Sequence, residues 1–569
     1  MVHKGILFLS AFIGTMSIMT VQAKTMPEFA SPVSEKDEPM QRGKFEPDWQ
    51  SLRQYQVPDW FRDAKFGIWA HWGPQCAPEH GDWYARFLYM ENAPGWAGDD
   101  YAYHRRHYGP PSEFGFKDVI HTWKAENWDP EKLMVLYKRA GAQYFVALAN
   151  HHDNFDNYDS RYQPWNSVHM GPKKDLIGTW AKAARDNGLR FGVSIHAAHA
   201  WIWYEPSQGA DESGNYAGVP YDGTLTKADG KGTWWEGYDP QDLYAQNHPR
   251  SAGADNPNAI HGQWDWGNGA SIPDAAYCTK FYNRTIDLMN KYHPDLVYFD
   301  DTVLPLYPVS DAGLKIAAHF YNSSMKWHNG RLEAVLTGKI LNPEQRKCMV
   351  WDIERGKSNR IEPFSWQTDT CLGSWHYDRR IFERHGYKSA KTVIQMLIDI
   401  VSKNGNLLLS VPVRSNGTID SDERKILEEI AAWMDVNKES IFDTRPWEIY
   451  GEGPSIGTAA PLSAQGFNEG QGKPLQADDI RYTVSKDGKT LYVFTMGRPA
   501  GGQLTLQSLR AQAGPDAQVS LLGYSDEIAC HANSPDGLTL NWDPSLTARP
   551  IDEYACVFKL CGFKFASDK

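Results

Sequence analysis

The chain has few cysteines for its length. Seven cysteines are spread over 569 residues, with no Cys-x-x-Cys pair and no His-Glu-x-x-His motif. This scarcity argues against a disulfide scaffold and against a structural zinc site. Because seven is odd, at least one thiol is free or pairs between chains. Three cysteines near the end of the chain could include one bridge, namely Cys530, Cys556 and Cys561.

The chain also has no excess of positive charge and no phosphate-binding motif. Its formal net charge is -12 and no run of basic residues occurs, which argues against nucleic acid as a partner. There is no glycine-rich phosphate loop to support phosphoryl transfer. These absences leave other kinds of hydrolase and binding protein open.

Long apolar runs are missing except at the N-terminus. Lys4 precedes an apolar stretch over residues 6–20, and Val21-Gln22-Ala23 follows it as a small-residue cleavage site. This pattern predicts a signal peptide over residues 1–23 and a secreted or periplasmic protein. The alternative, a membrane anchor, is disfavoured by the short apolar run. We expect a mature protein outside the membrane, beginning with a polar linker over residues 24–50.

Aromatic residues are abundant, with 23 Trp, 28 Tyr and 23 Phe. Many could fill hydrophobic cores. Several tryptophans instead lie in polar, glycine-rich sequence, where a core is harder to build: Trp201, Trp203, Trp234, Trp235, Trp264 and Trp266. Aromatic faces with polar rims suit sugar rings, which offer C–H faces and hydroxyl edges.

Short apolar strands alternate with amphipathic helices between residues 51 and 450. Strands are expected at 66–70, 144–149, 191–195, 296–299, 349–351 and 407–409, and helices at 128–139, 176–187, 279–292, 393–401 and 422–437. The alternation predicts an α/β domain with a parallel sheet. Residues 205–275 interrupt it as a long insertion, of the kind that shapes a substrate site.

The pattern changes at residue 451. Period-two segments follow, and Ile480–Val484 and Leu491–Phe494 flank a turn at Lys486–Lys489, which is a hairpin signature. Further strands are expected at 519–522, 538–540 and 555–560. We predict an antiparallel β-sandwich over residues 451–569.

Polar residues follow the expected strands of the α/β domain. The strand Leu296–Phe299 runs directly into Asp300 and Asp301. Asp300 continues the alternation of Leu296 and Tyr298, whereas Asp301 points to the other face. Other strands are followed by His71, by His151 and His152, by His196, and by Glu354. Because parallel strands gather their C-terminal ends at one rim, these side chains are expected to form one site.

Two carboxylates at strand ends, with neutral donors and an aromatic rim, favour glycoside hydrolysis. That reaction uses a pair of acids around a sugar C–O bond. Each residue alone has a structural explanation: Asp is common at strand ends, and His71 could be a hydrogen-bonded core residue. His151 and His152 with Asp153 could bind a metal, but no third ligand follows at a suitable spacing, so no metal is expected.

Motifs between about residues 55 and 450 together resemble glycoside hydrolase family 29, the α-L-fucosidases. Lys65–Gly73 is similar to that family's K-F-G-I-F-x-H-W-G, and Asn150–Phe155 to its K-H-H-D-G-F. Leu296–Asp300 resembles its L-x-W-x-D, in which the Asp is the nucleophile. Further matches are Trp128–Pro130, Ser365–Thr368, Gly373–Tyr377, Val401–Leu409 and Thr444–Trp447.

The resemblance implies a (β/α)8-like barrel followed by the β-sandwich. It implies a retaining exo-α-L-fucosidase that acts on fucosylated oligosaccharides or glycans without a cofactor. Asp300 would be the nucleophile and Glu354 the acid/base, with Asp352 and then Glu362 as alternatives. The implied substrate-binding residues are His71, Asp82, Trp83, His151, His152, His196, Trp366 and Trp375.

Several departures from the family pattern leave linkage preference open. Asn150 replaces a Lys, Asn154 a Gly, and Asp82 stands where Glu is usual. Two other functions stay open: a retaining hydrolase of α-L-galactosides, whose sugar carries one more hydroxyl than fucose, and a non-catalytic carbohydrate-binding protein on the same fold. Oligomeric state is not fixed by the sequence, and a homo-oligomer is allowed.

Overall fold

The computed structural model describes residues 29–94, 97–463, 467–526, 528–533 and 537–567. The expected signal peptide over residues 1–23 lies outside this range. Within the described range, no helix combines the length and apolar character needed to cross a membrane.

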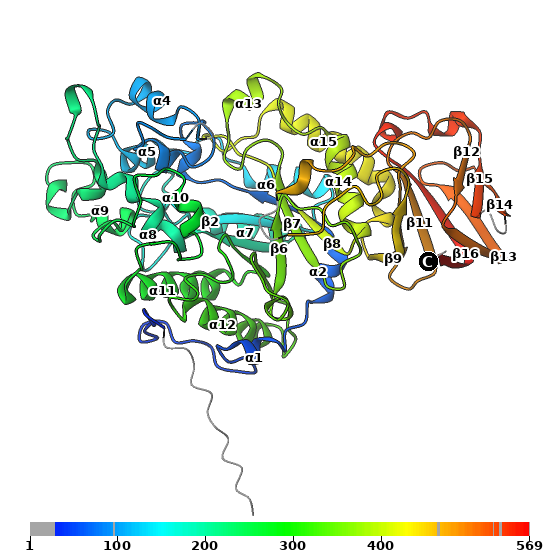
Figure 1. Cartoon of the computed structure of the whole chain (residues 1–569), viewed down its shortest axis with the longest axis horizontal. Helices are drawn as coiled ribbons and strands as arrows, with labels where there is room; N and C mark the ends of the chain where they lie inside the picture. The colour runs from blue at the N-terminus through cyan, green and yellow to red at the C-terminus, as the bar shows by residue number, and fades with distance from the viewer. Residues whose placement is uncertain (1–28, 95–96, 464–466, 527, 534–536, 568–569) are drawn as a thin grey trace, which may run out of the picture.

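Eight parallel strands close into a barrel in chain order, so the predicted (β/α)8-like fold is confirmed (Figure 1). β1 pairs with both β2 and β8, which closes the sheet. The strands are almost entirely buried, as expected for a parallel sheet covered by helices. They are β1 Phe66–Ala70, β2 Tyr144–Asn150, β3 Arg190–Ile195, β4 Leu296–Phe299, β5 Val335–Gly338, β6 Val350–Glu354, β7 Trp366–Cys371 and β8 Gly405–Ser410.

Six longer helices cover the barrel. They are α6 Pro130–Arg139, α7 Leu176–Asp186, α11 Ala275–Tyr292, α12 Ala312–Trp327, α14 Ala390–Ser402 and α15 Ser421–Asn437. Five of the six start with a side-chain cap: Asp129 of α6, for example, accepts from Lys132 N, and Asp420 with Glu423 forms a capping box at α15. Such caps satisfy backbone N–H groups that the first turn leaves unpaired.

The segment before the barrel packs on its surface, although the sequence suggests a linker over residues 24–50. Val33, Met40 and Phe45 are buried. Asn322 of α12 accepts from Phe45 N and donates to the carbonyls of Gln41 and Phe45. Few apolar residues are needed to fix this segment because side chains of the barrel satisfy its backbone. Helices α1 Trp49–Leu52 and α2 Asp59–Ala64 then lead into β1.

Short helices over the C-terminal ends of the strands shape the mouth of the barrel. After β1 they are η1 Pro74–Cys76, α3 Tyr84–Phe87, α4 Asp100–His107 and α5 Phe116–Thr122. After β3, in and before the insertion, they are η3 Ala197–His199, α8 Ala200–Trp203, η4 Glu205–Gln208, η5 Gly214–Tyr216, η6 Asp222–Thr224, η7 Lys227–Gly230, α9 Pro240–Tyr244 and α10 Ala259–Gln263. Later in the barrel are η8 Gln345–Lys347 and α13 Arg379–Glu383.

The C-terminal part consists of two antiparallel sheets around a separate hydrophobic core, beside the barrel (Figure 1). One sheet has the order β13-β16-β11-β10-β9 and the other β12-β15-β14. The elements are η9 Lys438–Ser440, β9 Thr444–Glu452, η10 Asn468–Gly470, β10 Ile480–Ser485, β11 Thr490–Thr495, β12 Gln503–Leu506, β13 Leu509–Leu521, β14 Ala529–Asn533, β15 Gly537–Asn541, η11 Pro544–Thr547, η12 Pro550–Glu553 and β16 Cys556–Ser567.

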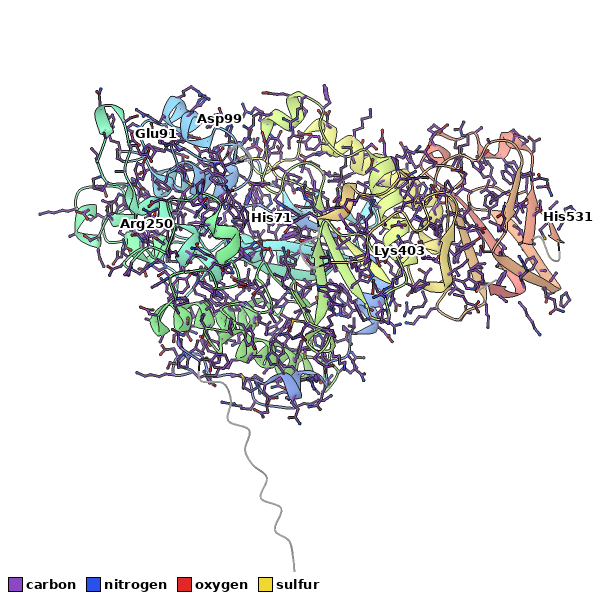
Figure 2. The ribbon with its side chains drawn as sticks, in the orientation of Figure 1. His71, Glu91, Asp99, Arg250, Lys403 and His531 are labelled. Carbon is purple, nitrogen blue, oxygen red and sulfur yellow. The ribbon has the colours of Figure 1, made fainter. Side chains whose placement is uncertain are left out.

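A buried ion cluster joins the two parts. Asp399 of α14 accepts from Lys403 Nζ at 2.7 Å and from Arg481 Nε of β10 at 2.6 Å. Figure 2 shows Lys403 on the side of the barrel that faces the C-terminal sheets. Because all three side chains are almost completely buried, each charge depends on the others for compensation.

Candidate active site

Asp300 lies directly after β4, where its carboxylate receives three polar contacts. His152 Nε2 lies 3.1 Å and His196 Nδ1 3.2 Å from Oδ2, and Lys339 Nζ lies 2.6 Å from Oδ1. The side chain keeps 21% of its surface exposed to the cavity above it. A carboxylate that is held from three sides yet open on one side is placed to react with a ligand.

These contacts decide the ionisation of Asp300. Burial alone would raise the pKa of the carboxyl group, but the charge of Lys339 and the hydrogen bonds from His152 and His196 outweigh it. They hold the pKa of Asp300 well below its usual range. Asp300 is therefore an anion throughout the neutral pH range, as a nucleophile must be.

Glu354 ends β6 and faces the same lysine. Lys339 Nζ lies 3.0 Å from Glu354 Oε2, so one ammonium group bridges the two carboxylates. Lys339 is 5% exposed. Burial opposes its charge, but Asp300 and Glu354 hold its pKa well above the usual range. Asp301, by contrast, turns away and contacts His199 Nε2 at 3.0 Å.

Five histidines gather beside Asp300. His71 follows β1, His151 and His152 follow β2, His196 follows β3, and His376 lies in the loop after β7. The His71 ring lies 5.4 Å from that of His151, 5.0 Å from that of His196 and 5.1 Å from that of His376. Figure 2 shows His71 in the middle of the barrel. The predicted convergence of strand ends is thus what the structure shows.

His71, His151 and His196 act as neutral hydrogen-bonding groups. Burial lowers the pKa of His196 to about 4, and burial with neighbouring imidazoles lowers the pKa of His71 and His151 well below the usual value. Gln75 Nε2 lies 2.7 Å from His151 Nδ1, and donation there leaves the proton on Nε2. Neutral imidazoles can both donate to and accept from sugar hydroxyls.

The same imidazoles have the spacing of metal ligands. Two groups of three nitrogens lie within 4.8 Å of one another, in His71, His151 and His376 and in His151, His152 and His196. Neutral imidazole is a common ligand of transition metals. A sugar with several hydroxyl groups uses the same nitrogens, so the geometry alone does not require a metal.

Asp82 and Trp83 lie at the edge of the cavity. Asp82 supports a neighbouring loop, and Trp83 forms part of the cavity wall. Asp82 accepts from Ser374 Oγ at 2.7 Å, Trp375 N at 3.2 Å and His376 N at 2.6 Å, which fixes the loop that carries Trp375 into the cavity. Trp83 has a left-handed backbone conformation and presents its ring to the cavity.

The cavity combines residues from seven strand ends and from the loops above them. It is lined by Trp69, His71, Asp82, Trp83, His151, His196, His261, Trp264, Tyr298, Asp300, Lys339, Glu354, Asp369, Trp375, His376 and Phe467. His152 reaches the site through its contact with Asp300.

Three sequence-based candidates lie elsewhere. Trp366 is the first residue of β7, at the opposite end of the strand from the cavity, and its Nε1 donates to Lys403 O. Glu362 precedes β7 and accepts from Ser358 Oγ. Both residues lie at the end of the barrel opposite the cavity. Asp352 points inward two residues below Glu354, roughly 6.6 Å deeper, and its Oδ2 accepts from Gln367.

Four residues that line the site were not predicted from the sequence: Lys339, His376, Asp369 and Phe467. His376 stands within the Gly373–Tyr377 motif, next to the predicted site residue Trp375, and that position is a signal that could have identified it. Lys339 follows the four-residue strand β5 without any recognisable motif. Asp369 follows the quoted Trp366 motif, and Phe467 belongs to the connection between β9 and β10.

Comparison with known proteins settles the family. The family model described as alpha-L-fucosidase matches residues 33–439, which include the whole barrel. The chain belongs to the alpha-L-fucosidase family. The model of the alpha-L-fucosidase C-terminal domain matches residues 473–561, so the antiparallel sheets of this family member are also typical of the family.

Curated relatives align with about nine tenths of this alpha-L-fucosidase family member. The alpha-L-fucosidase of Branchiostoma floridae is 25% identical over 91% of the chain and 96% of its own length. The human plasma alpha-L-fucosidase is 25% identical over 89% of both chains. The predicted resemblance and the predicted glycosidase class are therefore confirmed.

Solved structures have the same fold. The Thermotoga maritima alpha-L-fucosynthase matches with a TM-score of 0.63 at 24% identity, over 91% of this chain and 100% of its own. The Thermotoga maritima alpha-fucosidase in complex with fucose matches with a TM-score of 0.61 at 24% identity, with the same coverage. The barrel and the C-terminal domain are thus a shared architecture.

Proposed function

We propose that the protein is a retaining, exo-acting α-L-fucosidase in which Asp300 is the nucleophile and Glu354 the acid/base. The supporting observation is the single ammonium group of Lys339, 2.6 Å from Asp300 Oδ1 and 3.0 Å from Glu354 Oε2. The two facing oxygens can be no farther apart than the sum of these distances. That limit is below the ~6.5 Å separation at which inverting enzymes begin.

The environments of the two carboxyl groups suit different roles. Asp300 has the shorter contact with Lys339 and two imidazole partners, whereas Lys339 is the one side chain of the described residues with a direct polar contact to Glu354. The depressed pKa of Asp300 keeps that carboxylate ionised, which suits the nucleophile and leaves the acid/base role to Glu354.

The reaction follows from these roles. Glu354 donates its proton to the glycosidic oxygen as Asp300 attacks the anomeric carbon, and the leaving group departs from a covalent fucosyl-enzyme. Glu354 then removes a proton from water, and the hydroxide displaces Asp300. His71, His151, His152 and His196 would hold the fucose hydroxyls, and Trp375 would pack on the ring.

Azide rescue tests the acid/base assignment. Glu354→Ala should hydrolyse an aryl fucoside slowly, and added azide should restore turnover with fucosyl azide of the α configuration as the product. Asp352→Ala serves as the matched comparison because it lies on the same strand outside the cavity. Rescue of Asp352→Ala but not of Glu354→Ala would show that Asp352, and not Glu354, is the acid/base.

Terminal fucose on oligosaccharides or glycans is the proposed substrate, and secretion or export to the periplasm is the proposed location. The latter depends on the sequence of residues 1–23 alone. An enzyme outside the cytoplasm would meet polymeric or glycoprotein-bound fucose directly. N-terminal sequencing of the mature protein would test this, with cleavage after Ala23 as the expected result.

One observation favours α-L-galactosides as a second substrate class. Asp369 lines the cavity, and its Oδ1 has no hydrogen-bond partner, while Oδ2 accepts from Tyr298 at 2.7 Å. L-galactose is fucose with a hydroxyl on C6, and a carboxylate can accept from that hydroxyl. Comparable kcat/KM values for aryl α-L-galactoside and α-L-fucoside would support this second activity, and a preference above about 1,000-fold for fucoside would exclude it.

A further inference from the structure

A short turn from the C-terminal part of the chain is fixed to the rim of the barrel. Glu469 N donates to Arg355 O at 2.8 Å, and Glu469 also accepts from Thr370 Oγ1. Its second carboxylate oxygen lies 2.9 Å from Lys388 Nζ. Glu469 therefore ties the helix η10, Asn468–Gly470, to the ends of β6 and β7.

The neighbouring residue, Asn468, adds two hydrogen bonds to the same rim. Lys357 N donates to Asn468 Oδ1 at 2.6 Å, and Asn468 Nδ2 donates to Lys357 O at 3.0 Å. Lys357 lies three residues after Glu354. The turn is thus held beside the acid/base, and its position relative to the cavity is fixed.

Phe467 precedes this turn and lines the catalytic cavity. Its side chain is 52% exposed, and its backbone φ of 39° lies in the left-handed region, which is unfavourable for a bulky residue. Of the large apolar side chains that are exposed in the described part of the chain, it is the aromatic one and the one that lines this cavity. Strained backbone conformations cluster at ligand-binding sites, so the conformation of Phe467 at the cavity wall supports a ligand contact.

The insertion supplies further aromatic surface to the same cavity. His261 and Trp264 both line it, and both lie nearly parallel to Trp83, with interplanar angles of 22° and 19°. Trp264 also stacks on His199 with ring centres 4.0 Å apart. The insertion and the turn at Phe467, which are far apart in sequence, therefore both bring aromatic rings to the mouth of this cavity.

We propose that Phe467, with Trp264 and His261, forms the subsite for the first sugar of the leaving group. This inference rests on the proposed function, which places the fucosyl unit among the histidines and the departing oxygen at Glu354. The leaving group then passes the rim where Phe467 is anchored. Aromatic faces pack on the C–H faces of a pyranose ring, so the subsite binds a neutral hexose or hexosamine rather than a flat or strongly charged group.

Two kinds of substrate distinguish the contribution of this subsite from that of the catalytic groups. α-L-Fucosyl fluoride has a leaving group too small to reach Phe467. For comparison, fucosyl disaccharides with α-1,2, α-1,3 and α-1,4 linkages are screened and the best substrate is used. Phe467→Ala should lower kcat/KM for that disaccharide about five- to tenfold and leave the fluoride within about twofold of wild type.

Controls make the result specific. Phe467→Tyr keeps a ring and should retain most disaccharide activity. Ile456→Ala removes another exposed apolar side chain of the same β9–β10 connection, outside the cavity. It should leave kcat/KM unchanged for both substrates. An unchanged disaccharide rate in Phe467→Ala, or an equal loss on the fluoride, would overturn the subsite while leaving the proposed function intact. A wild-type enzyme that hydrolyses neither substrate would overturn both.

Discussion

Lys339 is the residue that makes the two carboxylates of the site different from an ordinary acid pair. It contacts Asp300 and Glu354 at once, and it is almost fully buried. Two carboxylates that share one cation repel each other less than two that stand alone, and the nearer one ionises more readily. The separation of roles between Asp300 and Glu354 thus depends on a third residue.

Removal of the Lys339 charge should move the pH profile in one direction. Without the ammonium group the pKa of Asp300 rises, so the nucleophile becomes protonated at higher pH. In Lys339→Met, the acidic limb of the profile of kcat/KM against pH should shift upward by about 1–2 pH units. Lys339→Arg keeps the charge and should leave the limb near its wild-type position. An unshifted limb in Lys339→Met would contradict the electrostatic role.

At this scale the sequence was informative only where residues adjoin a strand with a recognisable pattern. Asp300 and His71 follow apolar strands within quoted motifs, and both lie in the site. Lys339 follows a strand of four residues. Its role depends on contacts with Asp300 and Glu354, which lie 39 and 15 positions away in the sequence. The prediction of Trp366 as a site residue was wrong. Trp366 is the first residue of β7 and therefore lies at the end of the barrel opposite the cavity.

Among the structural elements, α14 has the clearest energetic role, since it carries the ion cluster at the junction with the C-terminal sheets. Asp399 accepts from both Lys403 and Arg481. Burial would raise the pKa of Asp399, but these two cations lower it below its ordinary value. Because the folded-state pKa is depressed, this stabilisation is present above the ordinary pKa of Asp and is lost as pH falls through the folded value.

Asp399→Asn should therefore destabilise the protein. The change leaves Lys403 and Arg481 buried without their counter-ion, which costs about 3 kcal/mol or more in the free energy of unfolding. Urea denaturation at pH 7, followed by tryptophan fluorescence, would measure it. Asp435→Asn, at an exposed position of α15, is the matched control and should stay within about 0.5 kcal/mol of wild type. Equal stability of both variants would show that the cluster is not stabilising.

Helices and strands of the barrel were predictable because their apolar periods and caps are local. The strand at 296–299 and the helix ending at Tyr292 match β4 and α11. β5 and the cavity-lining turn around Phe467 were missed, since the first is very short and the second is fixed by contacts with distant parts of the chain. Local pattern thus predicts the frame of the barrel better than it predicts the rim.

For the whole molecule, packing rather than covalent cross-links holds the described parts together. Cys76, Cys278, Cys348, Cys371, Cys556 and Cys561 are free, so none of them forms the bridge that the three cysteines near the end of the chain could have made. Cys556 and Cys561 lie in β16, five residues apart on one strand, which keeps them from meeting. The N-terminal residues 29–48 likewise pack on α11 and α12 through hydrogen bonds that composition alone did not reveal. Oligomeric state stays a prediction to be measured.

The free thiols can be counted. Protein purified without reductant and unfolded in guanidinium chloride should react with DTNB at six or more thiols per chain, because Cys76, Cys278, Cys348, Cys371, Cys556 and Cys561 are free. The melting temperature should also be the same with and without dithiothreitol, because no disulfide constrains the unfolded chain. A count of five thiols, with a lower melting temperature in reductant, would reveal a bridge.

Trapping of the reaction intermediate would show whether Asp300 forms a covalent bond with fucose. The enzyme is incubated with 2-deoxy-2-fluoro-α-L-fucosyl fluoride, digested, and mapped by mass spectrometry. The proposed mechanism predicts one fluorofucosyl group per chain, attached to Asp300. Attachment to Asp301, Asp369 or Glu354, or inactivation without any covalent adduct, would contradict it.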